Sequence, residues 1–310
     1  MQKTNEHSSG KKIIIFFTQF LRIDDVIKWS AISLLGFLLG ISSGSLENYL
    51  IPFGVFLVCT YCIMSFTFAV NNYFDADSDR RNPRRMHKNA IASGVISKKV
   101  ALISNCFLAI LALIISLVFS PFAFLFCGFL LLWMGLYSIP PFRLKGRPGV
   151  DVLWHFIAFA SIILWGNILS GPFSLMSFLI AVSVALFSCI GQVWNHYVDY
   201  EFDKESGTKT YAVHFGRETT KKTIQFFLAL HLLFLLPLFI FYIGSYLITL
   251  LVVLSGLVIG FLLLRPKKDG FPTKRSFEFY GATMVGGAVY ISCLVYHLFP
   301  LFGINLLKFI

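Results

Sequence analysis

The stretch LIPFGVFLVCTYCIMSFTFAVNNYFDADSDRR, residues 50–81, joins a long apolar segment directly to an acidic one. No charged residue occurs from Leu50 to Val70, and a helix of roughly 20 apolar residues spans about 30 Å of hydrocarbon. Asp75, Asp77 and Asp79 follow at once, although carboxylates are costly near a bilayer interior. The stretch therefore predicts a membrane-spanning helix that ends in a polar site.

The rest of the chain has the composition of a polytopic membrane protein. Its 310 residues are 57% hydrophobic and 13% charged, and a soluble domain cannot cover so much apolar side chain with a polar surface. The sequence predicts an all-α fold of nine transmembrane helices, at approximately 26–44, 50–72, 100–120, 121–138, 151–170, 173–196, 223–243, 246–264 and 280–302.

The Lys and Arg residues gather in alternate loops between the predicted spans. A net charge of +11 in a soluble protein suggests nucleic acid as a partner. Here, all of the 26 Lys and Arg residues except Lys308 fall in the second, fourth, sixth and eighth loops or in the N-terminal segment, with Lys28 at its edge. The positive-inside rule then places the N-terminus and these loops in the cytoplasm. We expect the lipid bilayer as a partner and no nucleic acid.

Small residues inside the predicted spans have ordinary packing interpretations. All six cysteines lie in apolar segments without metal-binding neighbours, so we expect them to be buried as small hydrophobic residues. The spacing Gly36-x3-Gly40 is typical of a close contact between two helices.

The acidic cluster occurs twice. Asn71-x3-Asp75-x3-Asp79 is repeated, 124 residues further on, as Asn195-x3-Asp199-x3-Asp203 within the stretch NHYVDYEFDKESGTKT. We therefore expect one transmembrane domain over residues 1–310, made of two parallel four-helix repeats, about 22–148 and 149–268, and a ninth helix, about 280–302. Equivalent helices would bring both clusters to one central cavity that opens to the cytoplasmic side.

The spacing of the cluster selects the side chains that act together. Residues i, i+4 and i+8 share one face of a helix, whereas Asp77 points away from it. Carboxylate and amide oxygens without His or Cys suit Mg²⁺. The prediction is two Mg²⁺ ions that hold a diphosphate. Asp75, Asp79, Asp199 and Asp203 serve as catalytic residues and metal ligands, and Asn71 and Asn195 serve as further ligands.

The loop after the fourth span reads LYSIPPFRLKGRPGVD and supplies cations between the two clusters. Cationic side chains bind phosphate groups through charge-assisted hydrogen bonds. Our candidate diphosphate-binding residues are Arg143, Lys145, Arg147 and, in the later SGTKT stretch, Lys209, with Arg85 and Lys88 weaker. Our candidates for lining the substrate cavity are Tyr137, Ser138 and Asn72.

Other interpretations remain open for the motifs. Each acidic cluster can cap and anchor a helix, and the basic loop can simply obey the positive-inside rule. A cation or substrate transporter would favour carboxylates near mid-span rather than at helix ends. Another intramembrane diphosphate enzyme, a CDP-alcohol phosphatidyltransferase, would require an Asp-Gly pair followed within a few residues by Ala-Arg, and this combination does not occur in the sequence.

Together the motifs resemble those of the UbiA-type intramembrane prenyltransferases. The resemblance covers essentially the whole chain, and rests on residues 71–79, on Asp199 to Asp203 with residues 207–210, on Tyr137 to Lys145 and on the ASGVIS element at 92–97. Two departures stand out: Asn72 stands where many members of that family have Asp, and Asn89-Ala90 stands where many have Arg-Pro.

This resemblance implies a fold and a reaction. Nine transmembrane helices would carry the two Asp-rich motifs on the second and sixth. The implied reaction is Mg²⁺-dependent transfer of a prenyl group from a prenyl diphosphate donor to a lipophilic acceptor, with release of diphosphate. The acceptor would be an aromatic quinone precursor or a lipid of the geranylgeranylglyceryl phosphate type.

Overall fold

The computed structural model describes residues 9–242 and 277–303, and every regular element within these two ranges is a helix. The described residues form two compact units. The first contains residues 9–34 and 48–145, and the second contains 35–47, 146–242 and 277–303. The division after Lys145 can be compared with the end of the first predicted repeat at about residue 148. The eighth predicted span, 246–264, lies outside the described residues.

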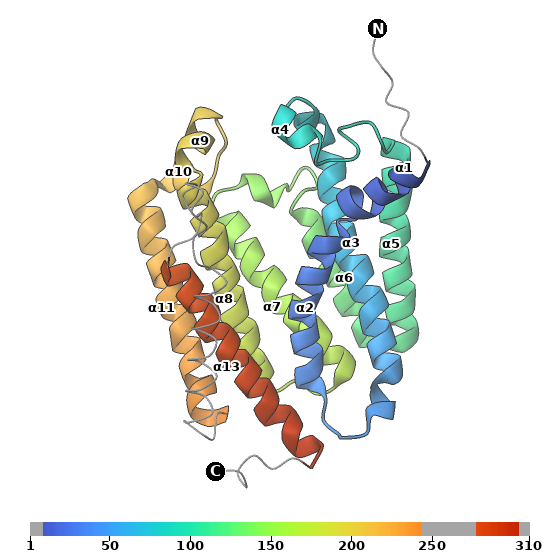
Figure 1. Cartoon of the computed structure of the whole chain (residues 1–310), viewed down its shortest axis with the longest axis vertical. Coiled ribbons are helices and arrows are strands. Elements are labelled where there is room, and N and C mark those ends of the chain that lie inside the picture. Colours follow the sequence, from blue (N-terminus) through green and yellow to red (C-terminus); the bar gives the residue numbers. More distant parts are fainter. Residues whose placement is uncertain (1–8, 243–276, 304–310) are drawn as a thin grey trace. The chain divides into compact units, whose positions relative to one another are not determined.

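The first unit is built on three long helices that contact one another, α3, α5 and α6 (Figure 1). Its elements are α1 (Ser9–Ile15), a π-helical turn (Phe16–Phe20), the first part of α2 (Ile23–Gly40), α3 (Leu50–Arg80), α4 (Pro83–Met86), α5 (Lys98–Phe119) and α6 (Pro121–Leu136). The helix α3 extends without a break from the apolar run through the first acidic motif.

A tight hairpin joins α5 to α6, which correspond to the adjacent predicted spans 100–120 and 121–138. Ser120 alone separates the two helices, and its Oγ accepts a hydrogen bond of 3.3 Å from the backbone N–H of Ala123. Pro121 occupies the first position of α6, where its missing N–H costs nothing. Serine as the N-cap followed by proline therefore ends one helix and starts the next.

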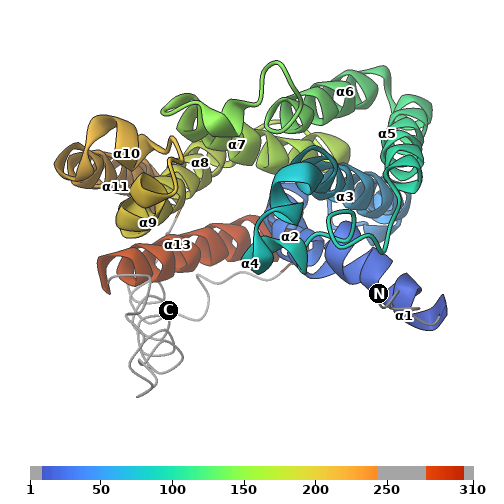
Figure 2. The ribbon, with the colours of Figure 1, turned by 90° about the horizontal axis from the view of Figure 1, so that it is seen from above.

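In the second unit α8 packs against both α7 and α11, and Figures 1 and 2 both show it between them. The elements are the last turns of α2, α7 (Val150–Ser170), α8 (Leu175–Val198), α9 (Tyr200–Glu205), α10 (Tyr211–Phe215), α11 (Arg217–Tyr242) and α13 (Phe277–Leu301). Buried apolar side chains join the first three of the long helices. They are Val152, Cys189, Ile190, Val193 and Ile224.

Within residues 9–242 and 277–303, five helical segments are long and apolar enough to cross a membrane. They are Leu46–Arg80, Lys98–Phe119, Val150–Ser170, Leu175–Val198 and Arg217–Ile240. Two shorter apolar helices, Pro121–Leu136 and Val285–Leu301, accompany them. Each falls on a span predicted from the sequence, with boundaries that differ by several residues. The total of nine helices stays a prediction.

The expectation that all six cysteines are buried is wrong for Cys106. Five are buried, but Cys106 is exposed on α5. Only 22% of the apolar window of that helix is buried inside the protein. An exposed apolar face on a membrane-spanning helix suits hydrocarbon, so a small weakly polar thiol is tolerated there as well as in the core.

Gly36 and Gly40 lie at a close approach of α2 to α7, which confirms the interpretation of their spacing. A Cβ atom on Gly36 would collide with the backbone carbonyl of Ile163, and one on Gly40 would collide with Ser170 Oγ. The Ser170 hydroxyl donates a hydrogen bond of 2.6 Å to the Phe37 carbonyl. Small residues thus let two backbones meet where a side chain cannot fit.

We expect Gly36→Leu to lower the thermal unfolding temperature of the detergent-solubilised protein by on the order of 5 °C, because the new side chain must displace backbone. Gly54→Ala is the matched control, since nothing lies within 4 Å of a Cβ at this position of α3. Fluorescence-detected unfolding of both variants provides the measurement. Equal unfolding temperatures for the two variants would contradict the close contact.

Candidate active site

The first acidic motif lies in the last turns of α3, so the helical period predicted from the sequence is realised there. Asn71, Asp75 and Asp79 are each partly exposed and recur every fourth residue of this unbroken helix. Asp77 is different, because it is exposed and pairs with Lys98 at 2.8 Å. The prediction that Asp77 points away from the face shared by Asn71, Asp75 and Asp79 is therefore confirmed.

Asp75 is the centre of a charged cluster within the first unit. Its Oδ1 accepts a hydrogen bond of 3.0 Å from Nη2 of Arg143, and its Oδ2 accepts one of 2.5 Å from Nζ of Lys145. The side chains of Asp75 and Lys145 are each only 16% exposed, whereas that of Arg143 is 45% exposed. Both carboxylate oxygens are thus neutralised by the loop that the sequence assigned to diphosphate.

The cluster extends to Asn71 and Ser138. The Asn71 Oδ1 accepts hydrogen bonds from Lys145 Nζ at 2.6 Å and from the Ser138 hydroxyl at 2.8 Å. The Lys145 ammonium also donates to Ser138 Oγ at 3.3 Å and lies 6.0 Å from the centre of the Tyr137 ring. Helix α3, the end of α6 and the following loop therefore bring together side chains that are far apart in sequence.

The backbone of the loop explains how its cations reach Asp75. Leu144, which separates the two cations in the sequence, is buried, and the Lys145 N–H donates a hydrogen bond of 3.2 Å to the Tyr137 carbonyl. Arg143 has a φ of 37°, in the left-handed region that non-glycine residues rarely adopt. Such conformations concentrate at functional sites, where the surrounding structure holds them in place.

Burial lowers the pKa of Lys145 below its usual value, and the neighbouring carboxylate of Asp75 acts in the opposite direction. The ammonium group is therefore in a place where the protein alone does not fully compensate its charge. An anion placed beside it would raise the pKa of Lys145 and be bound in return. This electrostatic setting suits a phosphate group.

Asp79 has a different kind of partner. Its Oδ2 accepts a hydrogen bond of 3.0 Å from Nδ2 of Asn89, a neutral buried amide in the loop before α5. The sequence marked Asn89 merely as a departure from the resembling family, so its contact with the motif was missed. The sequence feature that could have singled out Asn89 is its place before a turn, because the side chain of an Asn in such a place often bonds to the nearby backbone.

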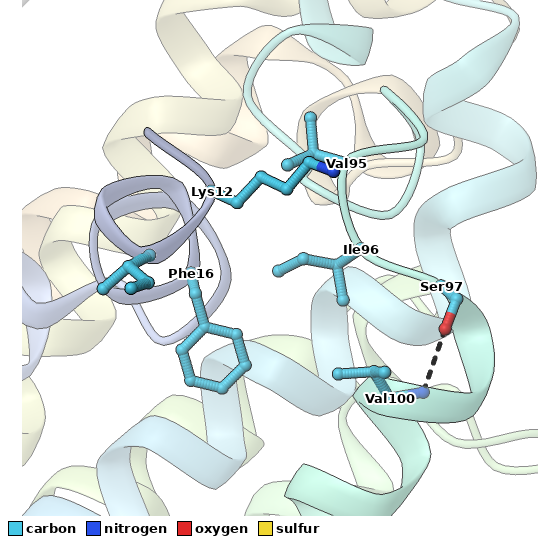
Figure 3. Close-up of a pocket in the computed structure, with 7 residues that line it drawn as sticks. Lys12, Phe16, Val95, Ile96, Ser97 and Val100 are labelled. Carbon is cyan, nitrogen blue, oxygen red and sulfur yellow. Dashed lines mark hydrogen bonds between the residues drawn. The ribbon is translucent and has the colours of Figure 1, made fainter. Parts of the chain in front are cut away.

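The loop between Asn89 and α5 is shaped by the ASGVIS element. Gly94 has a φ of 79°, which glycine adopts without strain, and Ser97 caps α5 by accepting from Val100 N–H at 3.2 Å (Figure 3). A groove of about 420 Å³ lies between this loop and α1, lined by Lys12, Ile13, Phe16, Val95, Ile96, Ser97 and Val100. None of these seven residues belongs to the predicted site.

Asn72 serves packing in this structure. It is 6% exposed, and its Nδ2 donates to the backbone carbonyls of Gln19 at 2.8 Å and Phe20 at 3.2 Å. Its amide therefore bonds to the backbone of the π-helical turn before α2, away from the charged cluster around Asp75. The sequence had assigned Asn72 to the substrate cavity, and the observed contacts give it a structural task.

The second motif has a different backbone from the first. Helix α8 ends at Val198, and Asp199, with a ψ of 7°, separates it from α9, so the expectation of one continuous helix is wrong here. Backbone bonds from Asp199 to Asn195 and from Asp203 to Asp199, 2.9 and 2.8 Å long, still keep the four-residue spacing. Aspartate competes with the backbone for hydrogen bonds, which makes it a common helix terminator.

A buried polar network that the sequence did not reveal lies beside the second motif. The Asp151 side chain is 3% exposed; its Oδ1 accepts from Gly149 N–H at 3.0 Å and its Oδ2 from Gln192 Nε2 at 3.2 Å. His196 Nε2 lies 3.5 Å from the same Oδ2. Because these groups come from α7 and α8, their sequence spacing carried no signal beyond an acid at the start of an apolar helix.

The remaining predicted phosphate ligands are solvent-exposed. Lys209 lies in the loop between α9 and α10, and Arg147 lies in the loop before α7. The Arg147 carbonyl accepts hydrogen bonds of 3.1 Å from the N–H groups of Val150 and Asp151. The weaker candidates Arg85 and Lys88 are exposed near α4.

The donor atoms of the first motif fit a hard cation. Within residues 9–242 and 277–303, no three His, Cys, Asp or Glu side chains come close enough to hold a metal. However, oxygens of Asn71, Asp75 and Ser138 all converge on one positive charge, the Lys145 ammonium. An all-oxygen set around a cation is the set that Mg²⁺ prefers, with water and phosphate oxygens completing its shell.

The fold and the site define the class of this protein: it is an all-helical integral membrane protein in which a basic loop neutralises an acidic motif at a helix end. A model of the UbiA prenyltransferase family matches residues 31–302. The chain therefore belongs to the UbiA prenyltransferase family, which confirms the resemblance seen in its motifs.

Solved structures share this fold. A UbiA homologue from Archaeoglobus fulgidus bound to GPP and Mg²⁺ has a TM-score of 0.67 and 21% identity, covering 93% of this chain and 99% of its own. A UbiA homologue from Aeropyrum pernix K1 has a TM-score of 0.62 and 17% identity, covering 88% and 98%.

A curated relative matches over part of its length. The digeranylgeranylglyceryl phosphate synthase of Thermococcus sibiricus is 29% identical over 172 residues. These residues make up 54% of this chain and 56% of the relative.

Proposed function

We propose that this protein catalyses Mg²⁺-dependent transfer of a prenyl group from a prenyl diphosphate to a lipophilic acceptor, with release of diphosphate. The observation that carries the proposal is the cluster in which Asp75 is bound by both Arg143 and Lys145. It places metal-type oxygens and phosphate-type cations within hydrogen-bonding distance of each other. If the acidic motif only capped a helix and the basic loop only obeyed the positive-inside rule, the two would have no need to pair with each other.

The residues of the cluster have distinct tasks in this reaction. Asp75 and Asp79, with Asn71, would hold Mg²⁺ in the first motif, and Asp199 and Asp203, with Asn195, would do so in the second. When bound, two Mg²⁺ ions supply positive charge that makes diphosphate a better leaving group.

Arg143 and Lys145 bind the diphosphate oxygens on which charge develops, with Arg147 and Lys209 as further contacts. The C–O bond of the donor breaks, and diphosphate leaves with the electron pair. The acceptor then forms its new bond to the same allylic carbon, and the proton lost from its attacking oxygen or carbon passes to water or to the released diphosphate. Tyr137 and Ser138, at the end of α6, lie beside Lys145 and serve to orient the donor head.

The acceptor that we propose first is a glyceryl phosphate lipid of the geranylgeranyl type. The support is the Thermococcus sibiricus relative, which is a digeranylgeranylglyceryl phosphate synthase. A second candidate is an aromatic quinone precursor, to which the sequence resemblance equally extends. We further propose that the nine helices form one domain with its N-terminus and its active-site loops in the cytoplasm, because the basic residues gather there.

An in vitro panel tests the proposal. Purified protein in detergent receives prenyl diphosphates of increasing length with each acceptor class, and chromatography detects the prenylated product. We expect product with Mg²⁺ and none above background with excess EDTA, with recovery on adding Mg²⁺ back. Product that persists in EDTA would contradict the metal requirement, and transfer of a phosphatidyl group instead would favour the CDP-alcohol class.

A further inference from the structure

The Asn89 side chain is buried beside the first acidic motif, and it is 2% exposed. Its Nδ2 donates to the Asn72 carbonyl at 2.8 Å and to Asp79 Oδ2 at 3.0 Å. Its Oδ1 accepts from the N–H groups of Ile91 at 3.0 Å and Ala92 at 3.3 Å. Both donors and the acceptor are thus engaged inside the first unit.

These partners fix the orientation of the amide. A flipped Asn89 would place its oxygen against the Asn72 carbonyl and the Asp79 carboxylate, which both accept hydrogen bonds. It would also aim its NH₂ group at two backbone N–H groups. The observed orientation is therefore the one that satisfies all four partners. A buried side chain held at four points is rigid, and it transmits that rigidity to the carboxylate it contacts.

The two carboxylates of the motif are held by chemically different partners. Asp75 is bound by two cations, Arg143 and Lys145. Asp79 accepts from the neutral amide of Asn89 through Oδ2, while its Oδ1 accepts no hydrogen bond from any described residue. A neutral donor orients a carboxylate without adding a positive charge beside it, so the oxygens of Asp79 are not paired with a cation in the way that those of Asp75 are.

We propose that Asn89 is a positioning residue that orients the Asp79 carboxylate for Mg²⁺. The inference rests on the proposed function, in which Asp79 is a metal ligand. Hydrogen bonds to a ligating carboxylate fix its geometry, and removing such a partner typically costs about 10–100-fold in metal affinity or activity. The Asn89 amide is neutral, so it orients the Asp79 carboxylate without competing for its charge.

Arg80 provides a matched comparison, because it anchors the same loop to the same helix without touching Asp79. Its Nε donates to the Ala92 carbonyl at 3.3 Å and its Nη2 to the Ile91 carbonyl at 3.4 Å. If Asn89 serves only to hold the loop, then loss of either side chain should have similar effects. If Asn89 orients Asp79, only its own loss should weaken metal binding.

The experiment measures Mn²⁺ binding to the purified full-length protein by electron paramagnetic resonance, with and without inorganic diphosphate. Asn89→Ser keeps an oxygen that can accept from the N–H groups of Ile91 and Ala92, but it is too short to reach Asp79. We expect Asn89→Ser to weaken Mn²⁺ binding about 10-fold. Arg80→Ala should bind Mn²⁺ like the unmodified protein.

A double-variant comparison assigns the effect to Asp79. If Asn89 acts through that carboxylate, adding Asn89→Ser to Asp79→Ala should cause no further loss of Mn²⁺ affinity. Asn89→Ala is a second single variant with the same expected 10-fold loss, which keeps the test available if the serine variant does not fold. Unchanged binding in the Asn89 variants, or an equal loss in Arg80→Ala, would overturn the positioning role.

The two proposals fail in different ways. If the unmodified protein transfers no prenyl group but the Asn89 variants bind Mn²⁺ more weakly, the proposed function falls and the positioning role stands. If the unmodified protein is an active prenyltransferase and its Asn89 variants bind Mn²⁺ normally, the proposed function stands and the positioning role of Asn89 is refuted. Transfer kinetics of the active enzyme add one more readout, because the half-saturating Mg²⁺ concentration should rise in Asn89→Ser while the KM for the acceptor stays unchanged.

Discussion

Asp75→Ala is expected to lower the rate of prenyl transfer by at least about 1,000-fold in purified protein supplied with Mg²⁺. The substitution removes a proposed metal ligand, and it also leaves Arg143 and Lys145 without the carboxylate that each of them contacts at 3.0 Å or less. The initial rate of transfer from a radiolabelled prenyl diphosphate provides the measurement. Elution as a single monodisperse peak in detergent shows whether the variant is folded.

Asp77→Ala is the matched control for this experiment. Asp77 lies on the same helix and two residues away, but its side chain is 65% exposed and pairs with Lys98 at the surface. Exposed ion pairs contribute little to stability, so we expect nearly full activity and an unchanged unfolding temperature. Similar rates for Asp75→Ala and Asp77→Ala would refute the assignment of one working face on α3.

The sequence predicted the arrangement of the first acidic motif on α3 correctly because helix geometry converts spacing into position. A residue repeated every fourth place must lie on one side of α3, and the separation of Asp77 from Asp75 follows from the same rule. The sequence assigned the cations of the basic loop to diphosphate, and their direct pairing with Asp75 is consistent with the need of a carboxylate near hydrocarbon for a cation. The family assignment, which rests on these same motifs, is confirmed by the match over residues 31–302.

Contacts that depend on tertiary packing carried no such signal. Asn89 reaches Asp79 because the loop after α4 folds back on α3, and Asp151 reaches Gln192 because α7 packs on α8. Neither pair has a helical spacing. The end of α8 at Val198 was missed for a related reason, because the motif there has the same four-residue spacing as the first. Spacing identifies a face only where the helix continues.

Asp199→Ala is expected to reduce prenyl transfer as severely as Asp75→Ala, by at least about 1,000-fold. Asp199 stands at the junction of α8 and α9, at the position equivalent to Asp75 in the repeat. Glu201→Ala is its control, because Glu201 is 72% exposed and lies 3.8 Å from Arg217 at the surface. Normal activity in Asp199→Ala would show that the second motif only ends a helix.

A double variant that carries both substitutions tests whether the two motifs serve one reaction centre or act independently. Residues that serve a single catalytic step are strongly non-additive, so Asp75→Ala/Asp199→Ala should be no slower than the slower single variant. Losses that multiply would mean that each motif contributes independently to the rate. Because the sequence predicts that both motifs hold the same diphosphate, the loss of either one should already remove the metal-assisted departure of the leaving group, and the second loss then has nothing left to remove.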